Sequence, residues 1–276
     1  MTTTLRPTEP LQRAADGTLS RHYQVCVNSR PVGAIHLGTS ASLGDSVARI
    51  IDLRIDEPDR GRGRATVAAL AAEEVARGWR CSRITAVVPA AAEPALRLVR
   101  SLGYVVTNRG MRKSLGGTPP ALPPDSRARP MTPEEFAAWE EYESEHYART
   151  WMERGLPEAA ARDKARRDHE RVLPRGLESD GMRFSVLEHA GTPVGTLWLA
   201  LDLRDGEGFV FDVQADAAHR GRGHGRTLML LAERQTIDAG YRALGLNVFQ
   251  GNTPAERLYE SLGYETTQYS LLKPLV

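Results

Sequence analysis

The sequence predicts two tandem α/β domains, each built on a mixed sheet, and three observations lead to this fold class. The chain has 276 residues and a mass of 30.3 kDa, beyond the size at which one hydrophobic core usually stops growing. Short runs typical of strands alternate with stretches of helical periodicity. Finally, residues of the first half recur in the second half at a constant spacing, which indicates a duplicated unit.

The repeat has an offset of 160 residues and needs no gap. Arg60-Gly61-Arg62-Gly63 recurs as Arg220-Gly221-Arg222-Gly223, and Ser101-Leu102-Gly103-Tyr104 recurs as Ser261-Leu262-Gly263-Tyr264. The same offset pairs Asp52 with Asp212, Asp56 with Asp216, Pro94 with Pro254, Leu98 with Leu258 and Lys113 with Lys273. A period this long indicates a duplicated domain, because solenoid units are only a few tens of residues long.

The join between the two copies is a Gly/Pro-rich segment without periodicity, typical of an exposed, semi-rigid linker. We therefore expect an N-terminal domain at 1–115, a linker at 116–126 and a C-terminal domain at 127–276.

The elements of the second domain follow from local patterns. Thr132-Pro133-Glu134-Glu135 is typical of a helix start, with an N-cap, a first-turn Pro and first-turn acids. The expected elements, after a short segment at 127–131, are helices at 132–152 and 157–173, strands at 184–187, 194–201 and 209–215, a helix after the Gly-rich segment, a strand at 244–249, and a last helix and strand.

The first domain follows the same pattern from Tyr23 onward, but only about 20 residues precede its first expected strand. The two leading helices of the second domain therefore have no counterpart in the first.

Composition excludes several classes of protein. The chain is 41% hydrophobic and 26% charged, so it is not disordered, and Lys+Arg 36 against Asp+Glu 35 argues against a nucleic-acid partner. Two cysteines, Cys26 and Cys81, are too few for a disulfide scaffold. We find no signal peptide and no apolar run long enough to span a bilayer, so we expect a cytoplasmic protein with no membrane partner.

The Gly-rich segment 220–225 lies between a predicted strand and a predicted helix, where backbone N–H groups suit an anion. The alternative is a tight turn with solvated arginines. A dinucleotide fingerprint fails on spacing, because the glycines follow G-x-G-x-G and not G-x-G-x-x-G, and a P-loop fails because Gly-Lys-Ser/Thr is absent.

A second motif follows about 30 residues later. Asn252-Thr253-Pro254-Ala255-Glu256-Arg257-Leu258-Tyr259-Glu260-Ser261-Leu262-Gly263-Tyr264 is typical of a capped amphipathic helix that ends at Gly263. Together the two motifs resemble those of the GNAT superfamily of acyl-CoA N-acyltransferases: Arg/Gln-x-x-Gly-x-Gly/Ala opening a helix, then Asn-x-x-Ala-x-x-Leu-Tyr-x-x-x-Gly-Tyr/Phe. The resemblance implies two GNAT-like domains, each with a mostly antiparallel twisted sheet flanked by helices.

The resemblance implies a site for acetyl-CoA as cosubstrate in the second domain. Its implied members are Val213 and Ala215 as strand backbone, the loop residues Arg220, Gly221, Arg222, Gly223, His224, Gly225 and Arg226, and Asn252 and Tyr259. A second possible CoA loop comprises Arg60, Gly61, Arg62, Gly63, Arg64 and Ala65. Ala92 and Val99 replace the motif's Asn and Tyr in the first domain, which predicts that this domain is catalytically degenerate.

Direct attack of an amine on the thioester calls for an acid and a base. The resemblance implies Tyr259 as the group that stabilises or protonates the departing thiolate, although packing alone also explains a Tyr on this apolar stripe, where Val99 is its counterpart. Asn252 is implied as a cofactor contact or as a simple helix cap. The resemblance implies Glu where Gln214 stands, so this copy lacks that carboxylate and Asp212 is a candidate base. The alternative is a structural role, because its twin Asp52 occurs in the degenerate first domain.

The helix at 132–152 carries glutamates that would attract a cationic amine if they line the acceptor cleft, and a solvated face is the alternative. These residues are Glu134, Glu135, Glu140, Glu141, Glu143 and Glu145. His146, His219 and His224 lack metal-ligand spacing, so we predict no metal.

The leading hypothesis is a tandem N-acetyltransferase whose C-terminal domain moves acetyl from acetyl-CoA to the primary amine of a small molecule, peptide or protein. One alternative is acetylation of a cysteinyl-sugar amine, since mycothiol synthase is similar in its tandem architecture. Another is a non-catalytic acyl-CoA-binding or regulatory module. We expect a monomer with its domains paired about a pseudo-two-fold axis.

Overall fold

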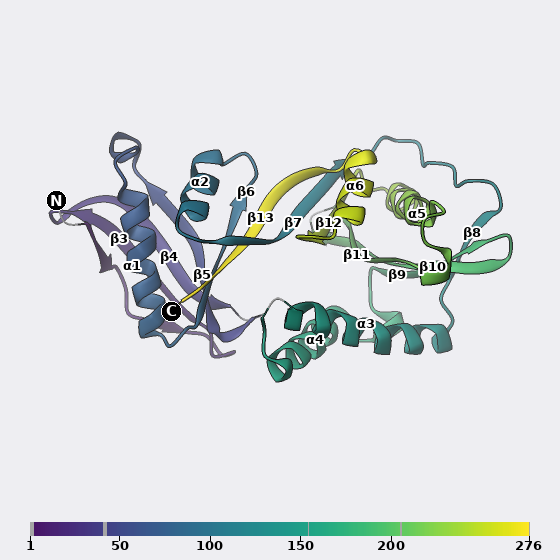
Figure 1. Ribbon diagram of the computed structural model, residues 1–276, viewed down its shortest axis with the longest axis horizontal. Helices are drawn as coiled ribbons and strands as arrows, with labels where there is room; N and C mark the ends of the chain where they lie inside the picture. Colours follow the sequence, from purple (N-terminus) through teal and green to yellow (C-terminus); the bar gives the residue numbers. More distant parts are fainter. Residues whose placement is uncertain (1–2, 41–42, 154, 205, 276) are drawn as a thin grey trace. The chain divides into compact units, whose positions relative to one another are not determined.

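The computed structural model describes residues 3–40, 43–153, 155–204 and 206–275, and its contacts divide the chain into two compact units (Figure 1). Unit 1 comprises Met1–Asn108 and Gln268–Val276, and unit 2 comprises Arg109–Thr267. Two strands, β7 (Val105–Ser114) and β13 (Glu265–Pro274), each contribute residues to both units.

Unit 1 has a mixed sheet in the order β1-β3-β4-β5-β6-β13, with β2 paired to β3. Its pairs are antiparallel except for the parallel pair β5 and β6. The elements are β1 (Thr3–Pro7), β2 (Gln12–Arg13), β3 (Leu19–Val27), β4 (Arg30–Ser40), β5 (Gly44–Ile55), a 3-10 turn η1 (Glu57–Asp59), α1 (Arg64–Gly78), β6 (Arg83–Pro89) and α2 (Glu93–Ser101).

Unit 2 repeats this design, with the order β7-β12-β11-β10-β9-β8 and one parallel pair, β11 and β12. The elements are β8 (Ser126–Pro130), α3 (Pro133–Glu153), α4 (Glu158–Val172), η2 (Gly176–Glu178), β9 (Met182–His189), β10 (Thr192–Arg204), β11 (Glu207–Ala215), η3 (Ala217–His219), α5 (His224–Asp238), β12 (Ala243–Phe249) and α6 (Thr253–Ser261). Two mixed, mostly antiparallel sheets flanked by helices confirm the predicted fold class.

The sheet of unit 1 is completed by the end of the chain. Strand β13 (yellow in Figure 1) pairs antiparallel with β6 from Gln268↔Pro89 to Pro274↔Arg83, and the Leu275 N–H donates to the Ser82 carbonyl at 2.8 Å. In unit 2 the corresponding bond runs from the Leu115 N–H to the Arg242 carbonyl, also at 2.8 Å. The repeat predicts that the last strand belongs to the sheet of the second domain. In the structure, residues 268–274 of this strand belong to unit 1.

Helices cover both faces of the sheet in unit 2 (Figure 1). Leu228 and Leu231 of α5 share one apolar cluster with Leu197 and Leu199 of β10. On the other face, Phe136 and Trp139 of α3 pack with Phe184 of β9 and Trp198 of β10. Because side chains alternate across a strand, Leu197 and Trp198 face opposite layers. In unit 1, the cluster around α1 has no such second helical layer among its own described residues.

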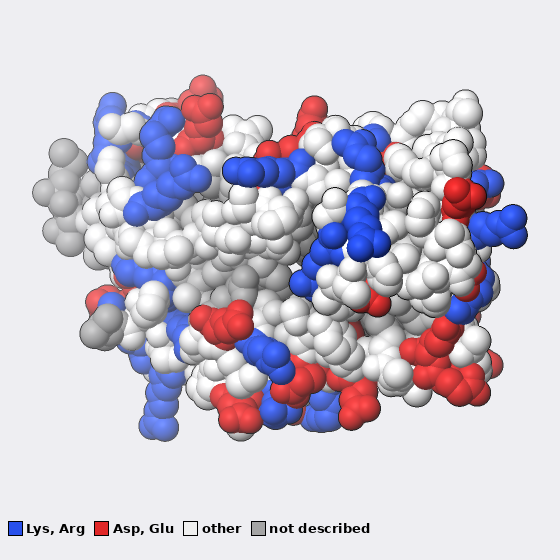
Figure 2. Space-filling model, turned by 45° about the vertical axis from the view of Figure 1, so that its right-hand side comes forward, with Lys and Arg blue, Asp and Glu red and all other residues white. Residues whose placement is uncertain are grey.

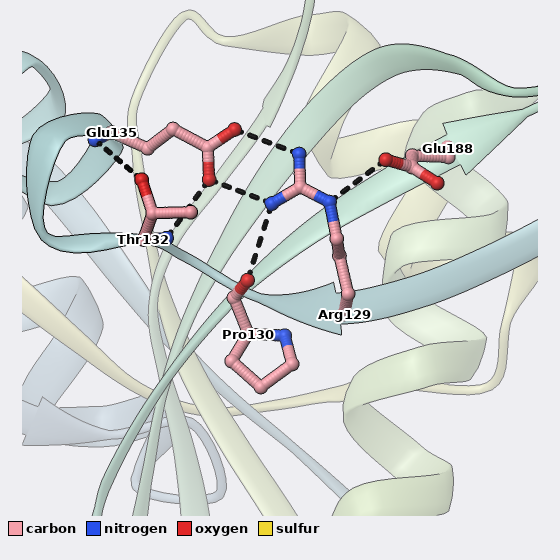
Figure 3. A network of polar contacts seen from close by, with 5 residues as sticks. All are labelled: Arg129, Pro130, Thr132, Glu135 and Glu188. Atoms are coloured by element: carbon pink, nitrogen blue, oxygen red, sulfur yellow. Dashed lines mark hydrogen bonds and ion pairs between the residues drawn. The ribbon is translucent and has the colours of Figure 1, made fainter.

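The start of α3 is fixed by a capping box (Figure 3). The Glu135 N–H donates to Thr132 Oγ1 at 3.2 Å, and the Thr132 N–H donates to Glu135 Oε2 at 2.9 Å. Arg129 on β8 binds both oxygens of Glu135 at 2.7 Å and binds Glu188 on β9 at 2.8 Å. The predicted helix start at Thr132 is therefore confirmed, and the same residues anchor α3 to the sheet.

The N-terminal segment differs from the sequence prediction. Strands β1 and β2 lie in the first 20 residues, where none was expected, and β3 begins at Leu19. They were missed because their residues are polar and mostly exposed, so they show no apolar alternation. In the described ranges, no helix is long and apolar enough to cross a membrane.

Candidate functional site

The predicted anion loop has the backbone of an open cradle in unit 2. Gly221 has φ +76° and Gly223 has φ +86°, and a Cβ built on either residue meets nothing within 4 Å. Glycine is therefore required there for the left-handed backbone and not for lack of space. Gly223 is the N-cap of α5, no side chain caps this helix, and no acid stands in its first turn. The exposed N–H groups and the helix dipole suit the pyrophosphate that the resemblance implies.

The remaining loop residues have packing and positioning contacts. A Cβ on Gly225 would lie 3.3 Å from Leu258 Cδ2, so this glycine allows close packing of α5 against α6. Arg226 donates to Ser261 Oγ on α6 at 2.9 Å, while Arg220 donates to the Ala215 carbonyl at 3.4 Å. Arg222 is exposed and His224 is buried.

Strands β11 and β12 separate beyond their first three paired residues. The parallel ladder runs from Gly208↔Leu244 to Val210↔Leu246 and ends there, although β11 continues to Ala215 and β12 to Phe249. On its other edge β11 stays paired with β10, through Val213↔Leu197 and Ala215↔Gly195. The predicted strand backbone at Val213 and Ala215 thus lacks a β12 partner, which leaves polar main-chain groups facing the opening.

A bulge on β11 directs Asp212 toward the α3 side of the sheet. Trp198 pairs with Asp212 and Leu199 with Val210, so Phe211 is the extra residue of the bulge. Asp212 Oδ2 is shielded from solvent and has no hydrogen-bond partner. Burial raises the pKa of Asp212 to about 6, opposed by the indole N–H of Trp139 and the Val213 amide.

In the sequence Glu143 is one of several glutamates of the helix α3, but the structure distinguishes it from the others. Glu143 is 9% exposed, while Glu134 and Glu141 are exposed. Burial, and next the charge of Asp212, raise the pKa of Glu143 to about 9. The available signal was spacing: Phe136, Trp139 and Glu143 follow i, i+3, i+7, which places this carboxylate on the apolar stripe.

Tyr259 of α6 is the third member of this group, since the charge of Asp212 acts on it. It is 9% exposed, so most of the ring is buried. Burial, and next the charge of Asp212, raise the pKa of Tyr259 to about 12. The phenol therefore stays protonated at neutral pH, as a proton donor must. The structure thus brings together two of the predicted residues, Tyr259 and Asp212, and adds Glu143.

Asn252 is the N-cap of α6. Its Oδ1 accepts from the Ala255 N–H at 3.3 Å, which supports the capping alternative, and a cofactor contact stays a prediction. Ala92 at the equivalent position of α2 provides no side-chain cap.

Unit 1 keeps the loop backbone but changes its surroundings. Gly61 and Gly63 have φ +70° and +71°, and the ladder of β5 with β6 ends at Ile50↔Ala86, as in unit 2. Arg64 is buried at the start of α1 in an ion pair with Asp59, whereas His224 stands at the start of α5. The other loop members are the exposed Arg60 and Arg62 and the half-buried Ala65.

The twin carboxylates of the repeat have different environments. Asp52 forms an ion pair with Arg54 at 2.8 Å and its side chain is 44% exposed, whereas Asp212 forms no ion pair among the described residues. Val99 occupies the place of Tyr259 in the apolar cluster of unit 1. Among the described residues of unit 1, the partly exposed Asp52 and the apolar Val99 therefore stand where unit 2 has Asp212 and Tyr259.

Three histidines lie near the start of α5 in unit 2. The His224 ring centroid lies 5.3 Å from that of His189 and 6.3 Å from that of His219. Over the described part of the chain, no group of three or more His, Cys, Asp or Glu side chains is arranged to hold a metal ion. The absence of a metal in the reaction stays a prediction.

Charges of both signs are spread over the face shown in Figure 2, where Lys and Arg alternate with Asp and Glu and with uncharged surface. This distribution agrees with the even charge balance of the sequence.

A family model described as the acetyltransferase (GNAT) family matches residues 3–104 and 135–264. The chain belongs to this family. The two matched segments correspond to the two copies of the repeat, so the chain has two GNAT-like domains in tandem.

Individual relatives agree with this assignment. An N-acetyltransferase, YycN of Bacillus subtilis, is 30% identical over 151 residues, which cover 53% of this chain and 96% of the relative. A mycothiol acetyltransferase of Thermobispora bispora is 39% identical over 90 residues, which cover 31% of this chain and 30% of the relative.

Two solved structures share the fold over nearly the whole chain. A GCN5-related N-acetyltransferase from Sphaerobacter thermophilus has a TM-score of 0.61 at 19% identity, covering 92% of this chain and 80% of its own. A tandem GNAT protein from the clavulanic acid biosynthesis pathway has a TM-score of 0.53 at 19% identity, covering 96% of this chain and 85% of its own.

Proposed function

We propose that this GNAT protein is an N-acetyltransferase that moves an acetyl group from acetyl-CoA to a primary amine, and that the C-terminal domain, 127–276, carries out the reaction. One observation carries the proposal. In unit 2 the open loop before α5, the separated strands β11 and β12, and the pair of Asp212 and Tyr259 occur together. The N-terminal domain, 1–115, has the loop and the strand separation but not the pair, so we propose that it is catalytically degenerate.

The residues of unit 2 fit the cosubstrate. The loop from Arg220 to Gly225 would hold the pyrophosphate on main-chain N–H groups, since Gly221 and Gly223 leave open space above the helix start. The unpaired edge of β11 at Val213 and Ala215 would bind the acyl and pantetheine part through its main chain. Acetyl-CoA supplies the activated thioester carbonyl when it is bound.

Asp212 and Tyr259 have complementary roles in a direct transfer. The acceptor is mostly an ammonium ion at neutral pH, and Asp212, with a pKa of about 6, accepts a proton from it. The amine nitrogen then bonds to the acetyl carbon as the carbon–sulfur bond breaks. Tyr259 gives its proton to the departing thiolate and regains one from the nitrogen side through Asp212.

A second candidate function is acetylation of a cysteinyl-sugar amine, which is favoured by the likeness of 90 residues to the mycothiol acetyltransferase. A third, a non-catalytic acyl-CoA-binding module, is favoured by Ala92 and Val99, which replace the motif's Asn and Tyr in the first domain, and by Gln214. All three candidates bind acetyl-CoA. The second differs from the leading proposal in its acceptor, and the third differs in that no acetyl group is transferred.

The deciding experiment is calorimetric titration of acetyl-CoA into the full chain, followed by an amine screen that includes cysteinyl-sugar amines. We expect one strong site that is lost in Gly223→Val and kept in the matched Gly63→Val, because both changes strain a left-handed glycine. Binding without turnover of any amine would favour the non-catalytic module. No binding at all would overturn the acyltransferase proposal.

A further inference from the structure

Two carboxyl groups, an indole and a phenol lie close enough in unit 2 to act on one another's charge. Asp212 Oδ2 and Trp139 Nε1 are both buried and have no partner at full hydrogen-bond distance among the described residues, although the indole N–H is near enough to lower the pKa of Asp212. Glu143, a residue that is 9% exposed, forms no hydrogen bond or ion pair among the described residues, and the buried Tyr259 phenol lies within the field of the Asp212 charge. Native proteins rarely leave buried polar groups unpaired, so this concentration indicates a ligand that completes them.

Among the residues that the structure describes, no Lys or Arg forms an ion pair with Glu143 or Asp212. Lys164 on the neighbouring helix α4 is buried, but it binds Asp168 at 2.6 Å and lies over the rings of Trp151 and Tyr147. The other groups that act on Glu143 and Asp212 are the indole of Trp139, the Val213 amide and the Tyr259 hydroxyl, and none is cationic. Burying two carboxylates without a counter-ion has an unfavourable desolvation free energy, and a bound cation would offset it.

The walls around the pair are aromatic. Trp198, the strand partner of Asp212, stacks on Phe211 with ring centroids 4.4 Å apart and meets Trp139 edge-on at 5.3 Å. Aromatic rings combined with carboxylates suit an alkylammonium ion, because rings attract the cation and also pack against its carbon chain.

We propose that Glu143 and Asp212 form a two-carboxylate seat for the ammonium group of the acceptor, and that the acceptor class is a cationic alkylamine without a carboxylate beside the amine. This inference rests on the proposed function, because it takes the bound amine to be the acceptor of the acetyl group. Binding of an ammonium group at the seat can nevertheless be tested without turnover. A carboxylate next to the amine would be repelled by the pair, which separates alkylamines from α-amino acids.

The proton balance gives each carboxylate a different role. Before the amine binds, the pair retains one proton, which Glu143 holds because burial and the charge of Asp212 together raise its pKa above that of Asp212, and Asp212 is the ionised partner. The ammonium ion neutralises the single negative charge. It then gives one proton to Asp212 and becomes the free amine that attacks. Glu143 is therefore a positioning residue, whose carbonyl oxygen accepts a hydrogen bond from the ammonium group.

Carboxyl carbon NMR of the full chain tests the seat directly. Glutamate and aspartate would be labelled with 13C at the carboxyl carbon, and the two resonances assigned by their loss in Glu143→Gln and Asp212→Asn. We expect one carboxyl to stay protonated above pH 7. Saturating butylamine should lower that apparent pKa, because a bound cation favours the ionised pair. Norvaline, which is butylamine with an α-carboxylate, should leave both resonances unchanged.

Kinetics supply the second measurement, using the amine with the highest turnover in the screen. Glu143→Gln should raise KM for the amine about 10- to 100-fold, as expected for loss of a charge-assisted hydrogen bond, and should leave KM for acetyl-CoA unchanged. The matched control is Glu153→Gln, an exposed glutamate at the end of the same helix. Asp52→Asn in unit 1 is the control for Asp212→Asn.

The outcomes separate the two proposals. Shifts with butylamine but no turnover of any amine would keep the seat and overturn acetyl transfer. Turnover with resonances that both titrate below pH 5, or that respond equally to norvaline or to Mg²⁺, would keep acetyl transfer and overturn the seat. A Glu143→Gln variant that fails to fold leaves the wild-type NMR titration as the test.

Discussion

Lys273 Nζ lies 2.7 Å from Glu73 Oε2, so the last lysine of the chain stabilises a carboxylate buried on α1 of unit 1. Its repeat counterpart, Lys113 on β7, lies 2.7 Å from Glu233 Oε1 on α5 of unit 2. Each lysine is thus supplied by the opposite copy of the repeat: Lys113 comes from the first copy and serves unit 2, and Lys273 does the reverse. Lys273 also lies over the ring of Tyr104 with 5.7 Å to its centroid.

Removing the lysine should destabilise unit 1. Lys273→Met leaves Glu73, which is 2% exposed, as an unpaired buried charge, and we expect a loss on the order of 3 kcal/mol in the free energy of unfolding. Urea denaturation followed by hydrogen exchange at β6 and β13 measures this loss.

The control for Lys273→Met is the double variant Glu73→Leu with Lys273→Met. It removes both charges together and should recover most of the stability, because no charge is then left unpaired. Equal stability of Lys273→Met and the wild type would show that the exchanged strand is held without this ion pair.

The anchor of α3 predicts an acid-sensitive contribution to stability. The hydrogen bonds from Arg129, and next that from the Thr132 amide, lower the pKa of Glu135 from its usual 4.5 to about 2. A lowered folded-state pKa stabilises the fold above the unfolded-state value, and this contribution is lost as the pH falls from about 4.5 to 2. Glu135→Gln should therefore lower Tm at pH 7 and show a flatter loss of Tm on acidification.

Glu134→Gln, which removes a neighbouring first-turn acid with no ion pair among the described residues, is the control for Glu135→Gln. It should keep the acid transition that depends on Glu135 and Arg129. If Glu135→Gln and the wild type lose Tm in parallel below pH 4.5, the Arg129 contact does not hold α3 in solution.

Tyr259→Phe tests the proton donor of the proposed reaction. Loss of a general acid lowers kcat by roughly 10²- to 10⁴-fold, while the ring keeps its packing and acetyl-CoA affinity should stay within about threefold. The matched control is Tyr264→Phe, in which a buried tyrosine of the same cluster, 6.1 Å away between ring centroids, loses its hydroxyl. An unchanged kcat in Tyr259→Phe would remove this residue from the mechanism.

Much of the fold was predictable because local patterns determine it. The N-cap at Thr132 and the glycines before α5 each required a particular backbone, and the structure has it at the predicted residues. The sequence did not predict that the last strand of each copy of the repeat lies in the sheet of the other unit. The reason is that Glu73 and Glu233 can each bind either lysine in the same way. A repeat that keeps both partners in both copies cannot reveal which copy supplies the strand.

The candidate site was predictable only in part, for a similar physical reason. Tyr259 and the loop belong to motifs with fixed spacing, but Glu143 stands about 70 residues before Asp212 and has no motif of its own. Its distinction from Glu141 or Glu153 is burial, which depends on the packing of α3 over the bulge at Phe211. Only its place on the apolar stripe of α3 signalled that burial in the sequence.

The seat carboxylates also predict a cost in stability that grows with pH. Glu143 keeps its proton to about pH 9 in the folded chain, whereas in the unfolded chain it loses it near 4.5, so its contribution to stability is present below pH 4.5 and is lost as the pH rises toward 9. Glu143→Gln, which is neutral throughout, should show a smaller fall in Tm between pH 5 and pH 9 than the wild type, and Glu153→Gln should behave as the wild type.

Butylamine at pH 8 should raise the Tm of the wild type and not that of Glu143→Gln, because the bound ammonium ion neutralises the buried negative charge and binds only the folded chain. A wild-type Tm that falls no more steeply with pH than that of Glu143→Gln would show that this carboxylate ionises freely in the folded chain.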